Sequence, residues 1–198
     1  MKRLLLAALT ALMITSVAPR AEAKIFEVWG SGLLGTSFGN GKTGKDFFSW
    51  VGGGAAGAEV GVKLLFLGAY IDYLRFFGGD AGANLVSFNL GGDGTVNFGP
   101  LALVFRLAGA FYIGTLPDDV TILRDGVAIK GNNVHTRGIG VRGGLGLRYT
   151  FLKIFSVGCT PQVGYHYFFG GADEDPRNEN SHGWDFQALG YFRVGLGF

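Results

Sequence analysis

The sequence predicts an all-β fold, an eight-stranded antiparallel transmembrane β-barrel with short periplasmic turns and longer extracellular loops. Three observations lead to this prediction. Apolar residues alternate with polar or small residues through eight segments, which is the period of a strand with one apolar face. Glycine is abundant, at 36 of 198 residues, yet 48% of the residues are hydrophobic, which argues against a disordered chain. Beyond residue 23 no apolar stretch is long enough for a spanning helix, whereas a barrel strand exposes only half of its residues to lipid.

The first 23 residues have the three parts of a secretory signal peptide. Lys2 and Arg3 form the positively charged start, a mostly apolar run covers positions 4–18, and Ala21-Glu22-Ala23 is a small-residue cleavage site. The apolar run is shorter than the roughly 18 residues of a membrane-spanning helix. We therefore expect a cleaved signal peptide at 1–23 and an outer-membrane barrel at 24–198.

The remaining chain is expected to be electrically neutral. The signal peptide carries three of the 17 basic and one of the 15 acidic residues, so 17 − 3 = 14 basic and 15 − 1 = 14 acidic residues remain. A neutral chain offers no basic surface for nucleic acid, which we do not expect as a partner. Two GxGxxG matches, which begin at Gly30 and Gly138, lack the following helix of a dinucleotide site, so we expect no cofactor and no metal. The single cysteine, Cys159, has no partner for an internal disulfide.

The first four expected strands cover residues 25–38, 48–63, 66–77 and 85–98. In each of them apolar side chains recur at every second position, and polar or small residues lie between them, as expected for a strand between lipid and a polar interior. The residues expected to face lipid are, in order, Phe26 and Val28; Trp50, Val60 and Val62; Leu67, Ala69, Ile71 and Tyr73; and Val86, Phe88, Leu90, Val96 and Phe98. Arg75 falls on the same side of the third strand. We expect it near the outer rim, where its charge reaches the interface or lipopolysaccharide phosphate.

The last four expected strands cover residues 101–114, 137–150, 155–169 and 184–198. The residues expected to face lipid are, in order, Leu101, Leu103, Phe105, Leu107, Phe111 and Ile113; Ile139, Val141, Leu145 and Leu147; Val157, Val163, Tyr165 and Tyr167; and Trp184, Phe186, Phe192, Val194, Leu196 and Phe198. Pro161 has no N–H for a ladder, so we expect a bulge or a local break there. Short turns are expected near 64–65, 99–100 and 151–154, and long loops at 39–47, 78–84, 115–136 and 170–183. This alternation assigns the short turns to the periplasm.

Apolar residues occupy alternate positions up to the C-terminal residue, namely Phe192, Val194, Leu196 and Phe198. This pattern resembles the C-terminal signal of Gram-negative outer-membrane β-barrel proteins, which the barrel assembly machinery reads. The whole chain resembles the small eight-stranded outer-membrane barrels, such as the transmembrane domain of outer membrane protein A and outer membrane protein X, in architecture and in this signal. The resemblance implies a place in the cell outer membrane, in contact with outer-membrane lipid and lipopolysaccharide, and assembly by that machinery. It also implies a role in envelope integrity, adhesion or leakage of small solutes.

Ten charged residues are expected to face the barrel interior. They are the acids Glu27, Glu59, Asp72, Asp93 and Asp185 and the bases Lys63, Arg106, Arg142, Arg148 and Arg193. Buried charges need partners, and an eight-stranded lumen is just wide enough for side chains to fill it. We therefore expect a network of ion pairs that plugs the lumen. The alternative is a narrow polar path whose ion pairs exchange partners and admit ions or small solutes.

The 115–136 loop contains two short β-rich runs around an Asp-Gly pair, a strong signal for a tight hairpin. The expected surface hairpin includes Val120, Ile122, Asp125, Gly126 and Ile129. A ribbon outside the membrane offers its backbone edge to a partner strand, so this loop is where we expect a surface partner to bind.

A hydrolase is the second alternative, because eight-stranded barrels include lipid A-modifying enzymes. Ser181 and His182 with Asp185 supply the residue types of a triad, but they fall in a polar segment that we interpret as a solvated loop. His166 is expected to be an interior residue. The sequence thus favours a non-enzymatic outer-membrane barrel with a structural or adhesion-like surface-interaction role.

Overall fold

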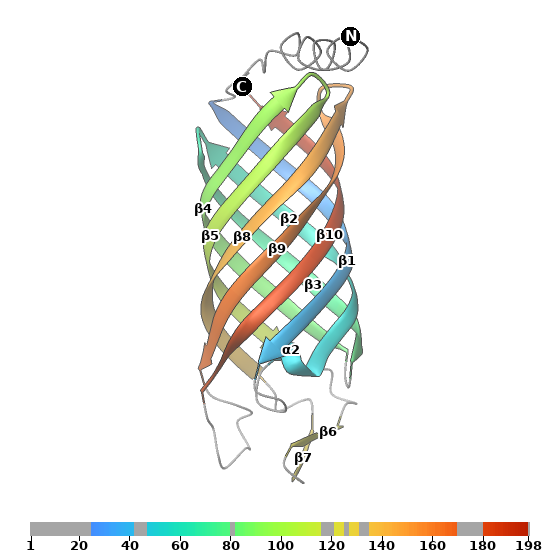
Figure 1. Cartoon of the computed structure of the whole chain (residues 1–198), viewed down its shortest axis with the longest axis vertical. Coiled ribbons are helices and arrows are strands. Elements are labelled where there is room, and N and C mark those ends of the chain that lie inside the picture. The colour runs from blue at the N-terminus through green and yellow to red at the C-terminus, as the bar shows by residue number, and fades with distance from the viewer. Residues whose placement is uncertain are drawn as a thin grey trace, which may run out of the picture.

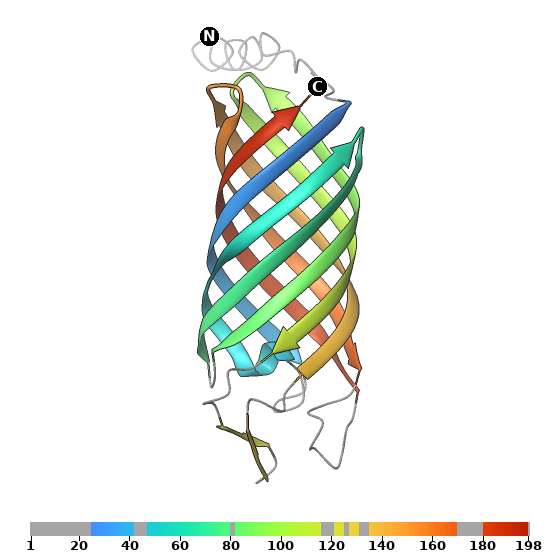
Figure 2. The ribbon, with the colours of Figure 1, turned by 180° about the vertical axis from the view of Figure 1, so that it is seen from behind.

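The computed structural model describes residues 25–41, 47–79, 82–115, 121–124, 127–130, 135–169 and 180–197. Eight long strands close into one antiparallel barrel (Figures 1 and 2). These strands are β1 (Phe26–Gly41), β2 (Val51–Leu64), β3 (Leu67–Gly79), β4 (Ala83–Phe98), β5 (Leu101–Thr115), β8 (His135–Phe151), β9 (Phe155–Phe169) and β10 (Ser181–Gly197). A short helix, α2 (Phe47–Trp50), precedes β2, and a small hairpin of β6 (Thr121–Arg124) and β7 (Val127–Lys130) lies between β5 and β8. The predicted signal peptide and Phe198 lie outside the described residues.

The predicted fold class is confirmed, and the predicted strands are correct to within three residues at each end. Each barrel strand pairs with its neighbours in the chain, and β1 pairs with β10 to close the sheet. A row of paired residues that starts at Val28 of β1 passes through all eight strands and returns to β1 at Asn40, a shift of 12 residues. This stagger sets the strand tilt and the width of the barrel, so the strands are strongly tilted relative to the barrel axis.

Three tight turns connect strands at one end of the barrel, the end at which β10 also finishes. They consist of residues 65–66, 99–100 and 152–154, close to the predicted positions. At the other end, residues 80–82 connect β3 to β4, so this connection is shorter than the predicted loop 78–84. The loop is shorter because Gly78 and Gly79 extend β3 while Ala83 and Asn84 extend β4. None of the described helical residues forms a helix that is long and apolar enough to span a membrane.

The outer wall is apolar and the inner wall is largely polar. Outward side chains such as Leu90 and Leu107 are among the most exposed of the molecule, at 69% and 68%. Outward aromatic rings pack together near both ends of the wall, as in the contact of Tyr165 with Trp184 and in the stack of Phe155 on Phe192. An apolar band between aromatic girdles is the surface that a β-barrel presents to lipid.

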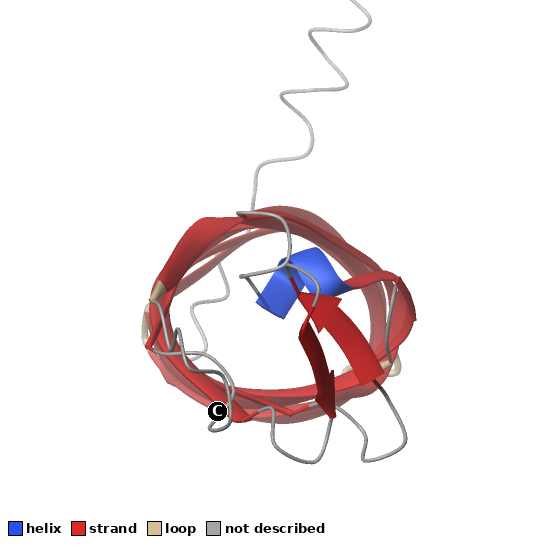
Figure 3. Cartoon of the chain, turned by 90° about the horizontal axis from the view of Figure 1, so that it is seen from below, coloured by secondary structure: helices blue, strands red, loops and turns tan. Residues whose placement is uncertain are grey.

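The predicted second strand begins too early. Residues 47–50 form α2 instead of strand, and Figure 3 shows this helix inside the outline of the barrel. Phe47 and Phe48 are both buried, each at 1% exposure. Consecutive residues of a strand point to opposite faces, so a strand would have left one of the two rings outside the lumen. A helical turn buries both.

Pro161 does not produce a bulge. The pairing of β9 with β10 runs through Pro161 without a shift, and the pairing with β8 resumes in the same register after a gap between Gln162 and Cys159. The proline therefore costs the β8–β9 ladder a local stretch of pairing, which is the break expected where an N–H is missing.

Candidate functional site in the barrel lumen

Glu59 on β2 is the centre of the part of the lumen that lies nearer the tight turns. Its carboxylate accepts two hydrogen bonds from Arg106 of β5, at 2.6 Å from Nη1 and 3.1 Å from Nη2. Arg193 of β10 donates a third at 3.1 Å, and the indole Nε1 of Trp29 on β1 donates a fourth at 2.6 Å. One carboxylate therefore links β5 to the three adjacent strands β10, β1 and β2, which suits the fork of donors on an arginine.

The ion pairs continue from this centre towards the tight turns. Arg106 Nε donates to Asp93 Oδ2 at 2.9 Å, and Lys63 Nζ lies 3.6 Å from Asp93 Oδ1. The same Lys63 nitrogen is 3.2 Å from Glu27 Oε2, and Arg148 Nη1 is 3.7 Å from the other Glu27 oxygen. All five side chains are buried, and each of them lies within ion-pair distance of an opposite charge in one continuous network.

Aromatic rings separate the arginines of this network. The Trp29 ring lies beneath Arg193 at 4.7 Å and Arg106 at 5.8 Å, measured from guanidinium carbon to ring centroid. Tyr70 lies 4.7 Å from Arg106 on the other side. Gly61 provides the space for the Trp29 ring, because a Cβ at that position would collide with it. These contacts add cation–π attraction and hold the guanidinium planes in place.

A second ionic layer lies closer to the outer end. Asp72 on β3 accepts hydrogen bonds from Ser87 Oγ at 2.9 Å and from Asn89 Nδ2 at 2.8 Å. Arg142 Nη1 of β8 is 3.7 Å from Asp72 Oδ2, and its guanidinium lies 5.3 Å from the Tyr112 ring. The acid of the second layer thus has partners different from those of Glu59.

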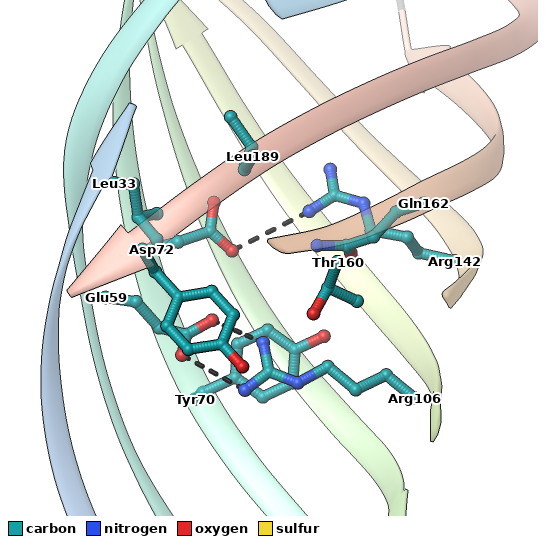
Figure 4. Close-up of a pocket in the computed structure, with 10 residues that line it drawn as sticks. Leu33, Glu59, Tyr70, Asp72, Arg106, Arg142, Thr160, Gln162 and Leu189 are labelled. Atoms are coloured by element: carbon teal, nitrogen blue, oxygen red, sulfur yellow. Dashed lines mark hydrogen bonds and ion pairs between the residues drawn. The ribbon is translucent and has the colours of Figure 1, made fainter. Parts of the chain in front are cut away.

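A cavity of about 10 Å³ separates the two layers (Figure 4). The residues around it are Leu33, Glu59, Tyr70, Asp72, Arg106, Arg142, Thr160, Gln162, Leu189 and Tyr191. Gln162 Oε1, the Tyr191 hydroxyl and two nitrogens of Arg142 are buried there without a protein partner. A polar cavity of this size suits about one water molecule.

Asp185 on β10 is paired with neutral or titratable groups rather than with an arginine. Its carboxylate lies 3.3 Å from His166 Nδ1 on β9 and accepts a hydrogen bond from Gln187 Nε2 at 3.1 Å. Gly164, directly opposite on β9, leaves room for the carboxylate, because a Cβ there would collide with it. His166 is fully buried, as predicted.

An aromatic cluster fills the outer mouth of the barrel, next to the pair of Asp185 and His166. The Phe48 ring of α2 lies 4.9 Å from the His166 ring, centroid to centroid. The other rings of the cluster, with centroid separations of 5.8–6.5 Å to one or both phenylalanines of α2, are Phe76, Tyr112 and Phe168. Their edge-on and tilted arrangements are the favourable ones for aromatic pairs. Sequence reasoning missed this plug, although two adjacent aromatic residues in an otherwise polar connection were a signal for it.

The structure places all ten predicted lumen residues inside the barrel and brings each within ion-pair or hydrogen-bond distance of another buried polar group. In the predicted assembly signal, Phe192, Val194 and Leu196 are exposed on the lipid-facing side of β10. In the predicted surface hairpin, Ile122 of β6 pairs with Ile129 of β7, while Val120, Asp125 and Gly126 lie outside the described residues. Within the described part of the chain, no three His, Cys, Asp or Glu side chains are grouped as metal ligands.

The interpretation of Ser181 and His182 as loop residues is wrong. Both belong to β10, which begins three residues earlier than predicted, and Ser181 faces inward at 3% exposure. The strand continues because Ser181 pairs with Phe168 and His182 with Tyr167, so β9 provides ladder partners up to its end. The Ser181 hydroxyl has no hydrogen-bond partner among the described residues.

A closed antiparallel eight-stranded barrel with an apolar exterior and a charged, side-chain-filled interior has the architecture of small outer-membrane β-barrel proteins, as the sequence predicted. No family model and no curated protein matches the chain. Among solved structures, Neisserial surface protein A matches with a TM-score of 0.52 at 13% identity, covering 85% of this chain and 96% of that chain. The N-terminal β-barrel domain of Pseudomonas aeruginosa OprF gives a TM-score of 0.46 at 12% identity, covering 84% and 97% respectively. At such identities the similarity shows the fold alone.

Proposed function

We propose that the protein is a non-enzymatic outer-membrane barrel with a closed lumen, whose role is structural or adhesive and is carried out at the cell surface. In this proposal residues 1–23 direct export and are cleaved, and the barrel assembly machinery inserts the chain. The observation that carries the proposal is the filled interior. Two ionic layers and the aromatic plug occupy the lumen at three levels, and the cavity between the ionic layers has room for about one water molecule, which supports a closed lumen.

The β6–β7 hairpin is the part of the described chain best suited to bind a surface partner. The two strands pair from Thr121 with Lys130 to Arg124 with Val127, and they form a sheet separate from the barrel. Among the described residues each strand has only the other as a ladder neighbour, so both outer edges offer backbone donors and acceptors. Such edges bind an extended partner segment by adding a strand.

Deletion of residues 120–129 tests this role. The deletion is expected to abolish binding to host cells or to a neighbouring cell, while the barrel remains folded, because the hairpin takes no part in barrel closure. The matched control removes ten residues from the 170–180 connection, which is expected to leave binding unchanged. Adhesion counts with both strains measure the effect, and full adhesion after loss of the hairpin contradicts the proposed role.

The absence of enzymatic activity has its own test. Mass spectrometry of lipid A from cells with and without the gene is expected to give identical acylation and phosphorylation patterns. A change in acyl chain number would make the barrel an enzyme. Substituting Ser181 or His182 by alanine would then show whether either residue is needed.

A further inference from the structure

Two arginines depart from the inward orientation of the other charged residues. Twelve charged residues lie in the eight barrel strands, and ten of them are buried in the lumen. Arg75 of β3 and Arg137 of β8 are exposed on the lipid-facing side. Both lie close to the outer ends of their strands, since β3 ends at Gly79 and β8 begins at His135. A guanidinium on this wall needs either water or an anionic group at the membrane interface.

The surroundings of Arg75 consist of hydrogen-bond donors. Arg75 pairs with Asn84 on β4, so the two side chains are direct neighbours on the outer wall. The Tyr73 hydroxyl donates to Asn84 Oδ1 at 2.9 Å. That bond occupies the amide oxygen and leaves the amide nitrogen of Asn84, a donor, available beside the guanidinium. No carboxylate of the described residues forms an ion pair with Arg75.

The shape of the wall leaves room for a ligand at this place. On the other side of Arg75 its partner on β2 is Ala56, whose small side chain leaves the guanidinium uncovered. Along β3 the arginine is flanked by two exposed aromatic residues, Tyr73 at 44% and Phe77 at 53%. Tyrosine on the outer wall is enriched at the level of the lipid head groups. The donors therefore face the layer in which phosphate groups lie.

We propose that Arg75 and Asn84 bind a phosphate group of lipid A, the membrane anchor of lipopolysaccharide, in the outer leaflet. The guanidinium provides two parallel N–H donors for the phosphate oxygens, and the Asn84 amide adds a third. The acyl chains of the same lipid lie along the apolar outer wall, towards the middle of the membrane. This inference goes beyond the proposed surface role. It requires only that the long connections lie on the outer side of the membrane.

Arg137 provides an internal control. Its neighbours in the sheet are Ile113 on β5 and Phe169 on β9, which are both apolar. It has the same charge, is also exposed and lies at the same end of the barrel, but neither of its ladder partners supplies a second donor. If charge alone attracted lipid A, the two arginines would contribute equally.

The experiment titrates bisphosphorylated lipid A into the purified, folded full barrel in phosphatidylcholine nanodiscs. Saturable binding is expected, and Arg75→Gln and Asn84→Leu are each expected to weaken it about tenfold or more, whereas Arg137→Gln changes it by less than about twofold. The mobility of unheated protein on a gel checks that each variant is folded. Equal losses for Arg75→Gln and Arg137→Gln, or no loss for either, overturn the proposal. Should Arg75→Gln fail to fold, unchanged binding by Asn84→Leu overturns it.

Two further lipids identify the source of the phosphate. Dephosphorylated lipid A is expected not to bind, because the donors have no anion to contact. Phosphatidylglycerol is expected to compete at least about tenfold less well, because it lacks the several acyl chains that follow the wall. Displacement of lipid A by an equal concentration of phosphatidylglycerol would show a general anionic-lipid site and overturn the assignment to lipopolysaccharide.

Discussion

At the scale of single residues, the lumen depends most on Glu59, which accepts hydrogen bonds from Arg106, Arg193 and Trp29. Replacement by glutamine keeps the shape and removes the charge. It leaves Arg106 paired with Asp93, and it leaves Arg193 with a hydrogen bond to Ser31 and no ion pair among the described residues. Breaking a buried ion pair by removing one partner costs about 3–5 kcal/mol. We expect Glu59→Gln to lower the free energy of unfolding by that amount, measured by urea titration in lipid vesicles.

The control for this prediction is Lys153→Gln in the turn between β8 and β9, where the lysine is exposed and has no ion pair among the described residues. A change within about 0.5 kcal/mol is expected there, as for most surface substitutions. If Glu59→Gln is as stable as this control, the ion pairs of Glu59 contribute nothing to the stability of the barrel, which contradicts the prediction.

Glycines in the inner wall are needed for space rather than for backbone flexibility. A Cβ at Gly61 would collide with the Trp29 ring, which packs against Arg193, whereas a Cβ at the lipid-facing Gly30 meets nothing within 4 Å. Gly61→Val is therefore expected to destabilise the barrel by about 1–3 kcal/mol through overpacking. Gly30→Ala is expected to be neutral. Tryptophan fluorescence during urea unfolding measures both, and equal stability of the two variants would contradict the packing of Trp29 described above.

At the scale of elements, α2 is a short helix whose two phenylalanines fill the outer mouth. Truncating a buried phenylalanine to alanine costs about 3–5 kcal/mol, so Phe48→Ala is expected to lower the unfolding free energy by about that much. Phe38→Ala, on the lipid-facing side of β1, is the comparison and is expected to cost less, because Phe38 is 56% exposed. Both values come from the same urea titration. A larger loss for Phe38 would place the important aromatic contacts outside the barrel.

The last strand is expected to direct assembly as well as to close the sheet. Phe192, Val194 and Leu196 form an exposed apolar row on β10, in register with the terminal Phe198. Removal of Phe198, or its replacement by aspartate, is expected to reduce the amount of barrel in the outer membrane, because the assembly machinery would recognise this row. Membrane fractionation measures it. Normal amounts of heat-modifiable protein after the truncation would contradict this function of the C-terminus.

The sequence predicted the strands well because each of them lies between two different environments. Along β5, residues from Leu101 to Ile113 alternate without exception between lipid and lumen, so the pattern determines the face of every residue. The helix α2 was missed because a four-residue helix has no recognisable period, and its position inside the barrel depends on space left by other strands. The partners of Asp185 were missed because alternation gives the side of a residue and not its height in the barrel.

At the scale of the whole molecule, the lumen is filled by layers of different chemistry. Ion pairs centred on Glu59 and Asp72 lie nearer the tight turns, and the aromatic plug on α2 lies at the outer end. The fold is shared by proteins of different function, and the filled lumen is therefore the property that separates a surface or structural barrel from a pore.

Conductance of the purified barrel in a planar lipid bilayer tests this central claim most directly. The ionic and aromatic layers predict at most rare, small openings for the native protein, because neither layer offers a continuous path for hydrated ions. The same low conductance is expected for Phe48→Ala, in which both ionic layers remain. A steady, large conductance of the native protein would contradict the closed lumen and would favour the narrow pore.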